Sequence, residues 1–472
     1  MGHPILLLVL SLVLIPARTH EEGHISVILH DKGINFAKDL LIKKAVSSII
    51  PLQLPDIERH VKIPIIGKVH VVLSKITIYS LDVPSSSVDS GGDIRGITLI
   101  ASGATAHLTM NWKYSYKNWV VEISDSGAAS VQVNDMEIWV TVTLKEEDGS
   151  IKLSMLDRGC HLKDISIKMD GGASWLYQVL VDAFEGPIGT AIQKAISNKI
   201  EKGILKLDSR LQSLPKQVSI DNVSAMNVAF VDDPLFSDSS VKLDIDGLFI
   251  AADNVLVPNY YYDRMQASDS LSCPSKMIAL SLHENVFNSA AEVYFNAGYM
   301  HWTVERFPNQ SLLNTATWRF LYPQLYKQYP DDDMSLKILL TSPPVVKITK
   351  EIDATIYLDV TVNVFDANEV IPVACVSLVI SASGSPHISR NKLAGFLKLK
   401  HFTVSPKWSN IGGMHLIEPI AFAVVETEII PYVNLRLVKG FQIPVLHRFI
   451  LKNAEIHYSA SKMMICSNIA LT

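Results

Sequence analysis

The sequence predicts an α+β fold made by tandem duplication of one unit: a strand, a helix, a long antiparallel sheet and a second, long helix. The stretch ISVILHDKGINFAKDL, starting at Ile25, returns as IALSLHENVFNSAAEV, starting at Ile278, with His30 matched by His283. Long alternating strand patterns follow each copy, and an apolar helical pattern closes each half. We therefore expect two barrels, each a highly twisted antiparallel sheet with a short and a long helix, joined by a central antiparallel sheet.

Each copy of the repeat is expected to begin as a strand and continue as a helix. In the first copy, apolar residues alternate from Ile25 to Leu29 and then recur at steps of three and four from Ala37. This change of period is the signature of a strand that gives way to a helix. Asp31 and Glu284 stand at the changeover, where a carboxylate suits a helix N-terminus.

Long strands are expected to follow in the first half. Their alternating patterns cover residues 60–81, 96–116, 118–149 and 151–169. Because strands usually have five or six residues, patterns of this length imply a strongly twisted sheet, with Gly and Ser marking bends or bulges. A long helix is predicted over residues 173–204, with a kink at Gly186-Pro187.

The second half repeats this order. A helical pattern over residues 311–333 precedes strand patterns and a closing helix; the strands are expected at 335–340, 345–366, 371–384 and 392–408, and the helix at 415–441. We predict a signal peptide at 1–20, an N-terminal barrel at 21–210, a connecting segment with central sheet at 211–270, a C-terminal barrel at 271–450 and a last strand of the central sheet at 451–472.

The N-terminus is typical of a secretory signal. Residues from Ile5 to Ile15 are apolar and uncharged, and Pro16 follows, so cleavage is expected between Ala17 and His20. Secretion would make the sequons at Asn222 and Asn309 glycan acceptors on the surface. It would also allow disulfides among the four cysteines, whose three possible pairings the sequence leaves open: Cys160, Cys273, Cys375 and Cys466.

The charge balance argues against nucleic-acid binding. Residues 18–220 carry 23 basic and 23 acidic side chains, and the net charge of −5 arises in the second half. A nucleic-acid-binding domain needs a broad basic face, which this balance does not provide. An anionic ligand must therefore be met by a local cluster of cations.

Motifs for catalysis and metal binding are weak. The run HEEGH, residues 20–24, matches the pattern of zinc proteases, but that chemistry needs a helix, and here the motif contains Gly23 and lies beside the expected cleavage site. The triplet Asp331–Asp333 could ligate calcium, but is more typical of a solvated loop. We expect no enzyme activity, no cofactor and no metal. A hydrolase, the alternative from another class, would need a nucleophile beside a base, and no such constellation stands out.

The helix stripes that face the long sheets have two interpretations. They can fill an ordinary core, or they can bound an apolar cavity that accepts acyl chains. Small residues along the stripes favour the cavity. The candidate pocket residues are Ile34, Ala37, Leu41, Leu180, Ala183, Ile192, Val286, Ala290 and Val293.

Basic residues recur in two segments of the first half. They are Arg59, Lys62 and Lys68 in the first segment, and Lys113 and Lys117, interleaved with Trp112, Tyr114, Tyr116 and Trp119, in the second. Cations beside amphipathic aromatic residues suit a phosphate-bearing lipid surface. The alternative is a charged edge that protects a sheet from aggregation.

Five segments resemble the family of bactericidal permeability-increasing protein and lipopolysaccharide-binding protein. They are DKGINFAKDL, IPIIGKVHVVLSKITI, LSLHENVFNSAAEVYFNAG, KWSNIGGM and LVKGFQIP, in the family's order and spread over almost the whole mature chain. The divergence resembles that of a plant member. The resemblance implies a boomerang of two barrels joined by a central sheet, each barrel with an apolar pocket for a phospholipid, and lipopolysaccharide contacted by cations at the N-terminal tip.

The resemblance also sets expectations for individual residues. The lysines named above fall in the segments that match the tip, but Pro64 stands where the animal proteins are more basic. Cys160 matches the first cysteine of the family disulfide, whereas the partner region near Ile200 has no cysteine. We therefore expect that bridge to be absent or rearranged.

The function that the resemblance implies is binding of lipid A and phospholipids at a bacterial outer-membrane surface. The expected protein is a secreted, monomeric glycoprotein of antibacterial defence and innate immunity, located in the apoplast or the vacuole of a plant. The alternative is an extracellular transfer protein for phospholipid or neutral lipid without specificity for lipopolysaccharide.

Overall fold

The computed structural model has an α+β fold dominated by antiparallel sheets. It describes residues 21–63, 67–90, 96–117, 119, 122–170, 177–252, 265–266, 273–305, 310–367, 369–389, 391–410, 421–422, 424–443 and 449–471. The chain divides into two compact units. Unit 1 comprises Met1–Ile28, Pro215–Asp232 and Leu243–Thr472, and unit 2 comprises Leu29–Leu214 and Asp233–Lys242. The predicted signal peptide and Asn309 lie outside the described residues.

The duplicated motif has the predicted strand-to-helix form. Strand β2 (Ile25–His30) continues into helix α2 (Asp31–Ile49), and β17 (Ile278–His283) continues into α4 (Glu284–Asn296). His30 and His283 occupy the two N-cap positions, and an acidic residue opens each first turn. The Nδ1 atom of His283 accepts a hydrogen bond from the Asn285 amide at 3.1 Å, which satisfies one of the free donors of the α4 N-terminus.

Unit 2 contains an eight-stranded antiparallel sheet with the order β10-β8-β7-β5-β3, in which β4 pairs with β5, β6 with β7 and β9 with β8. The strands are β3 (Leu52–Gln53), β4 (Ile57–Ile63), β5 (Gly67–Asp82), β6 (Ser85–Asp89), β7 (Ile97–Lys117), β8 (Glu122–Glu147), β9 (Ser150–His161) and β10 (Asp164–Asp170). Two predicted single strands, 60–81 and 151–169, are each two strands. Both β9 and β10 pair with β8, at different stretches of it.

Bulges curl this sheet. The β5–β7 ladder shifts register between Ser74 and Thr77, and the β7–β8 ladder shifts between Ala101 and Ala104. Lys75 has a φ of 52° and Gly103 a φ of 70°, so both take the left-handed backbone that a bulge requires. Such bulges bend the strand and increase its twist, which lets long strands wrap around a helix.

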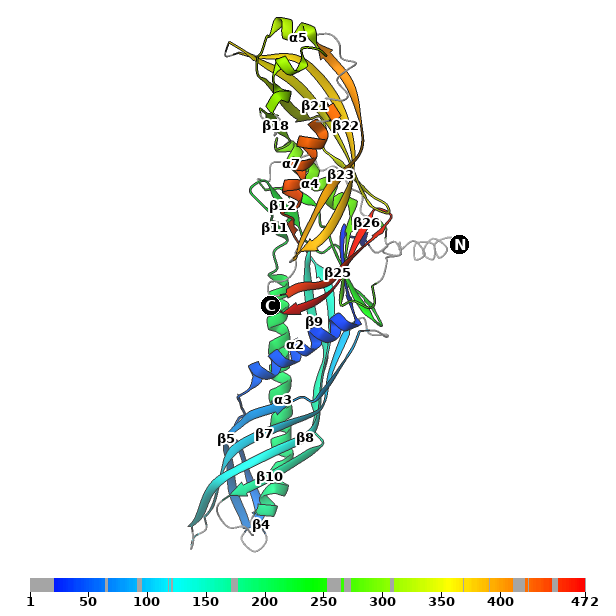
Figure 1. Ribbon diagram of the computed structural model, residues 1–472. Helices are drawn as coiled ribbons and strands as arrows, with labels where there is room; N and C mark the ends of the chain where they lie inside the picture. The colour runs from blue at the N-terminus through cyan, green and yellow to red at the C-terminus, as the bar shows by residue number, and fades with distance from the viewer. Residues whose placement is uncertain are drawn as a thin grey trace, which may run out of the picture. The chain divides into compact units, whose positions relative to one another are not determined.

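The helix that fills this sheet is α3 (Tyr177–Gln212), which continues past the predicted end at Ile204. Its backbone lies closest to β9, β10 and β4, and Figure 1 shows it as the long helix of this unit, crossed by β5, β7 and β8 in this view. Its buried side chains follow a four-residue spacing and are Leu180, Phe184, Ile188, Ile192 and Ile196. Pro187 lies inside the helix, and the Gly186 carbonyl accepts a hydrogen bond from the Thr190 hydroxyl at 3.0 Å.

A six-stranded sheet has the order β13-β14-β2-β17-β26-β25. The strands not yet defined are β13 (Leu235–Ser237), β14 (Ser240–Ile245), β25 (Phe449–Ser459) and β26 (Lys462–Leu471). The predicted C-terminal strand is thus a hairpin of β25 and β26. Smaller sheets are formed by β11 (Gln217–Ser219), β12 (Ser224–Asn227) and β15 (Phe249–Ala251), and by β1 (Glu21–Glu22) with β16 (Met265–Gln266).

Unit 1 also contains a seven-stranded antiparallel sheet with the order β18-β19-β21-β22-β23-β24, in which β20 pairs with β21. Its strands are β18 (His301–Val304), β19 (Met334–Leu340), β20 (Val345–Ile348), β21 (Ile352–Asp366), β22 (Glu369–Ser389), β23 (Lys392–Ser409) and β24 (Phe441–Gln442). The predicted single strand 345–366 is again two strands, β20 and β21.

Short helical segments accompany this sheet. The predicted helix over residues 311–333 is three short pieces, η2 (Gln310–Leu313), η3 (Thr315–Trp318) and α5 (Pro323–Gln328). The closing helix contains a π segment, η5 (Val425–Ile429), directly before α7 (Ile430–Leu437). Pro431 in the first turn of α7 lacks an amide hydrogen, so the preceding turn loses a regular helical bond there. None of the helices in the described part of the chain has the length and apolar character needed to cross a bilayer.

Candidate functional site

An apolar hollow lies between α3 and the curled sheet of unit 2. Its free volume is only about 10 Å³, room for about one water molecule. It is lined by Val71, Leu73, Met110, Ile167, Met169, Leu180, Val181 and Phe184. Because this lining offers no hydrogen-bonding or ionisable side chain, it matches hydrocarbon in chemistry, but a chain enters only when side chains move apart; the lining has no group that would act on a reactive bond.

The predicted pocket residues fall into three groups. On α3, Leu180 lines the hollow, while Ala183 and Ile192 pack in the same core. On α2, Ile34 is buried, Ala37 is half-buried and Leu41 is 45% exposed; none of the three lines the hollow.

The third group lies on α4 in unit 1. Val286 is buried in a cluster with Ile25 and Leu280, Val293 is buried, and Ala290 is half-buried. Of the predicted pocket residues, Leu180 alone lines the hollow described above, and a separate pocket beside α4 stays a prediction.

Sequence reasoning missed most of the lining of the hollow. Val71 and Leu73 on β5 and Ile167 and Met169 on β10 are inward positions of their strands. Their alternation was available as a signal, because residues two apart face the same side of a sheet. Which inward positions border a hollow rather than a filled core depends on packing, which alternation does not report.

Four lysines gather on the opposite, outer face of the same strands. In β4, Lys62 is exposed between buried Val61 and Ile63. In β5, Lys68 is exposed beside buried Val69, and in β7 the exposed Lys113 alternates with buried neighbours. Lys117 follows on the same face as Lys113, since the two are four residues apart in one strand.

Arg59 does not belong to this face. It is three residues from Lys62 in β4, so it shares the side of Val61 and Ile63, although its own side chain is exposed.

The aromatic residues of this segment differ in exposure. Trp112 and Tyr114 are 1% and 7% exposed and face the core, whereas Trp119 is 96% exposed. Burial, together with the Asp125 carboxylate, raises the pKa of the Tyr114 phenol.

The charges of this lysine face are only partly compensated. Lys117 pairs with Glu122 at 3.1 Å, and His70 contacts Glu58 at 2.5 Å. Lys62 and Lys68 are directly opposite each other in the β4–β5 ladder. In the described part of the chain, Lys62, Lys68 and Lys113 form no ion pair. Like charges placed opposite each other destabilise a sheet, so an anion bound between them would be favoured.

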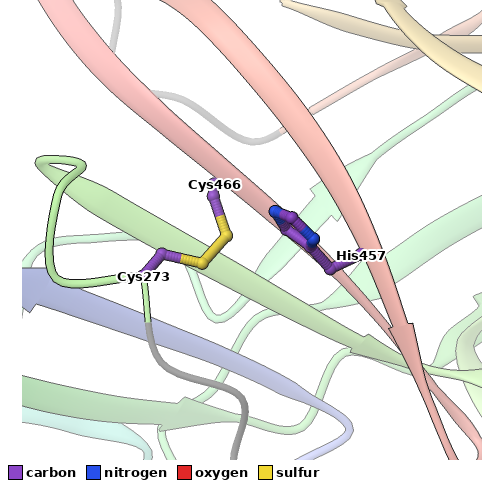
Figure 2. Close-up of side chains that lie close together, drawn as sticks. All are labelled: Cys273, His457 and Cys466. Carbon is purple, nitrogen blue, oxygen red and sulfur yellow. A yellow bond between two sulfur atoms is a disulfide. The ribbon is translucent and has the colours of Figure 1, made fainter.

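The cysteines resolve into one disulfide and two thiols. Cys273 and Cys466 are bonded, with Cα atoms 6.1 Å apart, and His457 lies beside them (Figure 2). Cys160 and Cys375 are buried thiols. The expected absence of the family bridge at Cys160 is thus confirmed, and burial raises the pKa of this thiol to about 11.

The remaining sequence motifs have structural explanations. Glu21 and Glu22 lie in strand β1, so the HEEGH run lacks the helix that a zinc protease needs. Asp331–Asp333 form no group of metal-binding atoms among the residues described; Asn314 donates to the Asp331 carbonyl at 3.2 Å. Asn222 is exposed in the turn before β12, as a glycan acceptor requires.

Family models match both halves of the chain. The N-terminal domain of the LBP / BPI / CETP family matches residues 33–214, and its C-terminal domain matches residues 218–471. The chain belongs to the LBP/BPI/CETP family. The sequence is 46% identical to a putative BPI/LBP family protein of Arabidopsis thaliana, covering 98% of this chain and 96% of that protein.

Animal members of the family align over the same length. The bactericidal permeability-increasing protein of Sebastes schlegelii is 27% identical, covering 97% of this chain and 98% of its own. Human lipopolysaccharide-binding protein is 22% identical, covering 99% and 97%. A crystal structure of lipopolysaccharide-binding protein superposes with a TM-score of 0.67 at 18% identity, covering 96% of this chain and 99% of that one. This superposition supports the predicted fold.

Proposed function

We propose that this chain is a secreted, non-enzymatic lipid-binding protein that binds lipopolysaccharide through the lysine face of unit 2 and holds phospholipid acyl chains in apolar sites. One observation carries the proposal. Strands β5 and β7 line an apolar hollow with Val71, Leu73 and Met110 on one face and present Lys68 and Lys113 on the other. Lipid A combines phosphates with acyl chains, and these two faces complement the two chemistries.

The size of the hollow sets the manner of lipid entry. Its free volume of about 10 Å³ is far below the usual range of ligand pockets, about 300–1,000 Å³. An acyl chain would therefore have to displace side chains or part of α3. Met110 and Met169 ease this displacement, because unbranched thioether side chains adapt to new shapes.

The energetics favour exchange with a membrane over capture from water. Burial of each methylene contributes about 0.8 kcal/mol, so two acyl chains taken from water would exceed the practical ceiling of affinity, about −20 kcal/mol. In a membrane the chains are already buried. Transfer between a bilayer and the protein then has a small net free energy, which suits a carrier at a bacterial outer-membrane surface. We place this activity in antibacterial defence and innate immunity.

A second candidate is an extracellular carrier of phospholipid or neutral lipid that does not distinguish lipopolysaccharide. The wholly apolar lining favours this candidate, because such a lining contacts acyl chains and offers no group that would recognise a head group. The acidic neighbours Glu58 and Glu122 favour it as well, because they compensate part of the charge on the lysine face.

Lipid analysis of the recombinant protein distinguishes the candidates. Native mass spectrometry and solvent extraction report which lipids remain bound after purification. Binding is then compared for lipopolysaccharide micelles, phosphatidylcholine vesicles and triglyceride emulsions. Preference for lipopolysaccharide that weakens with salt supports the first proposal, and equal uptake of all three supports the carrier. A protein that stays free of lipid and takes none from vesicles would contradict both.

A further inference from the structure

Three side chains with metal-binding atoms meet in unit 1, outside the candidate lipid sites. They are Cys273 before β17, His457 on β25 and Cys466 on β26. Their donor atoms all lie within 4.8 Å of one another, and Figure 2 shows the imidazole beside the disulfide. The two cysteines are nearly inaccessible, whereas the His457 side chain is 49% exposed. The group therefore has a buried sulfur side and a side open to solvent.

The register of the sheet holds this arrangement. In the β25–β26 ladder, Glu455 is opposite Cys466, and His457 is opposite Met464. His457 and Cys466 are thus diagonal neighbours on one face, within reach of each other's side chains. On its other side Cys466 pairs with Ala279 of β17, the strand that follows Cys273. Three backbone segments fix the donors, so the site does not depend on one flexible loop.

A fourth donor is present in the same cluster. The Met464 sulfur is 3.6 Å from the Cys273 sulfur, and both side chains are buried together with Cys466. Because Met464 is directly opposite His457, its thioether and the imidazole approach the cysteines from adjacent strands. Two thiolates, one imidazole and one thioether make a donor set rich in soft sulfur.

The surroundings can orient the imidazole. A ring nitrogen of His457 lies 3.8 Å from a Glu455 carboxylate oxygen, and Glu455 in turn forms an ion pair with Lys276. Lys276 also donates to the Asn453 carbonyl at 2.9 Å. A carboxylate that accepts from the non-ligating nitrogen is the usual partner of a metal-bound histidine.

We propose that, with the disulfide reduced, Cys273, Cys466, His457 and Met464 form a binding site for Cu(I). A dithiol reductant transfers two electrons and two protons to the disulfide, giving two thiols and its own disulfide. Binding of one Cu(I) then releases the two thiol protons as the thiolates bind the metal. Thiolate and thioether ligands select Cu(I) over harder ions, and the thioether distinguishes this set from the thiolate and imidazole sets of structural zinc sites.

The geometry needs little adjustment. In a tetrahedral site with bonds of about 2.0–2.3 Å, neighbouring donor atoms lie about 3.3–3.8 Å apart. Reduction moves the two sulfur atoms from bonding distance towards this separation; a His457 nitrogen lies within 4.8 Å of both sulfur atoms, and the Met464 sulfur is 3.6 Å from that of Cys273. The disulfide and the metal therefore exclude each other, so occupancy depends on the redox state of this pair.

A competition titration tests the site. The full chain is reduced with a phosphine, desalted without oxygen and titrated with Cu(I) in the presence of bicinchoninate. We expect one Cu(I) per reduced chain and none in the oxidised chain. The double variant Cys273→Ser/Cys466→Ser should lose this stoichiometric binding. Since even outer-shell changes lower metal affinity about 10- to 100-fold, His457→Gln and Met464→Leu should each weaken it at least tenfold.

The matched control is Cys160→Ser/Cys375→Ser, which removes the other two thiols. It should retain wild-type stoichiometry and affinity. Binding by the oxidised chain, or by Cys273→Ser/Cys466→Ser, would overturn the proposal, as would a preference for Zn(II) in direct competition. Failure of the reduced wild type to bind Cu(I) would overturn it too, whether or not near-ultraviolet circular dichroism shows a folded chain.

Discussion

Lys62 on β4 and Lys68 on β5 face each other directly across an antiparallel ladder, on the outer face of the sheet that encloses α3. Each exposed cation near an anionic lipid surface contributes about 1 kcal/mol, and at 0.1 M salt its field extends over a Debye length of about 10 Å. The pair thus has a local effect on ligand binding and on the stability of the sheet.

Reversal of charge on the lysine face should weaken lipopolysaccharide binding. For Lys62→Glu/Lys113→Glu we expect a loss of tens-fold or more, since four unit charges change at about 1 kcal/mol each. Wild-type binding should also weaken as salt rises. Binding is measured at two salt concentrations, together with co-purified lipid, which should not change.

The chain offers a matched control in Arg59→Glu, the same charge change on the opposite face of β4. It should weaken binding less than Lys62→Glu does. Equal effects of the two single variants would mean that only the overall charge of the protein affects binding. Unchanged binding in all variants would mean that the lysines form a solvated edge of the sheet and do not contact the ligand.

Removal of one lysine of the facing pair should stabilise the unliganded protein. Lys68→Thr relieves the repulsion from Lys62 and places a β-branched residue in a strand, so a gain of about 0.2–1 kcal/mol is expected. Urea unfolding at low salt measures it. Lys168→Thr on β10, where the facing residue is Ser130, is the comparison, and a gain of the same size there would assign the effect to strand propensity.

A bulky side chain in the hollow should exclude acyl chains. Val181 lines the hollow and is only half-buried, so the indole of Val181→Trp can extend from this position over the opening of the hollow without a large loss of packing. If four methylenes are displaced, the loss is about 3 kcal/mol, or more than a hundredfold in lipid affinity. Lipid extraction measures this loss. Ile192→Ala, which leaves the lining unchanged, should lower stability by about 2–5 kcal/mol without emptying the site.

Asp221 and Tyr294 should give unit 1 a pH dependence at both extremes. The Tyr294 hydroxyl donates to the Asp221 carboxylate at 2.5 Å. Burial, the largest single effect, pushes the pKa of Asp221 upward, but hydrogen bonds from Tyr294, Val223 and Ser224 together lower it. Burial, followed by the bond to Asp221, raises the pKa of Tyr294 to about 12.

The sign of each contribution follows. A lowered carboxyl pKa stabilises the fold above its ordinary value near 4, and this stability is lost as pH falls below it. A raised phenol pKa stabilises the fold below pH 10, and this stability is lost between about 10 and 12. Melting temperatures across pH should show both losses, and Tyr294→Phe should reduce both. Identical profiles for the variant and wild type would contradict this linkage.

Reduction of the disulfide should destabilise the fold without exposing Cys160. The bridge joins residues 193 positions apart, and the chain-entropy model assigns a loop of this length about 5 kcal/mol. Urea unfolding with and without reductant measures the loss. Cys160 should stay unreactive towards a thiol reagent near pH 8, because it is buried and its pKa is raised to about 11. Modification of Cys160 in the native protein would show that its site opens.

The sequence predicted the helices and strands better than it predicted where one strand ends and the next begins, or which side chains share a face. Periodicity located β2, α2, β17 and α4, because a period is a local property of the chain. It did not separate β4 from β5, since the alternating pattern of the sequence continues from one strand into the next. The grouping of Arg59 with the lysines followed nearness in sequence, whereas Arg59 and Lys62 lie three residues apart in β4 and so face opposite sides of the strand; a role of Arg59 in ligand binding stays a prediction.

Contacts between distant segments lay beyond sequence reasoning. The sequence left three ways to pair all four cysteines, whereas the structure bonds Cys273 with Cys466 and leaves Cys160 and Cys375 as thiols. The approach of His457 and Met464 depends on the register of β25 with β26. The hollow beside Phe184 likewise depends on how well neighbouring side chains fill space. The alternating pattern of a strand predicts which face of the sheet a side chain lies on. It does not predict whether the side chain packs against a neighbour or borders an empty space.

The four-residue spacing of the buried stripe on α3 has a geometric consequence for lipid entry. Four residues advance an α-helix by about 40° beyond a full turn, so the stripe from Leu180 to Ile196 winds through about 160° of the helix circumference. A sheet that covers such a stripe wraps the helix instead of lying under it. The helix cannot then lift away as a flap hinged at one end. Separation of the helix from the sheet must begin locally around Leu180, Val181 and Phe184, while the turns around Ile192 and Ile196 stay packed against the sheet.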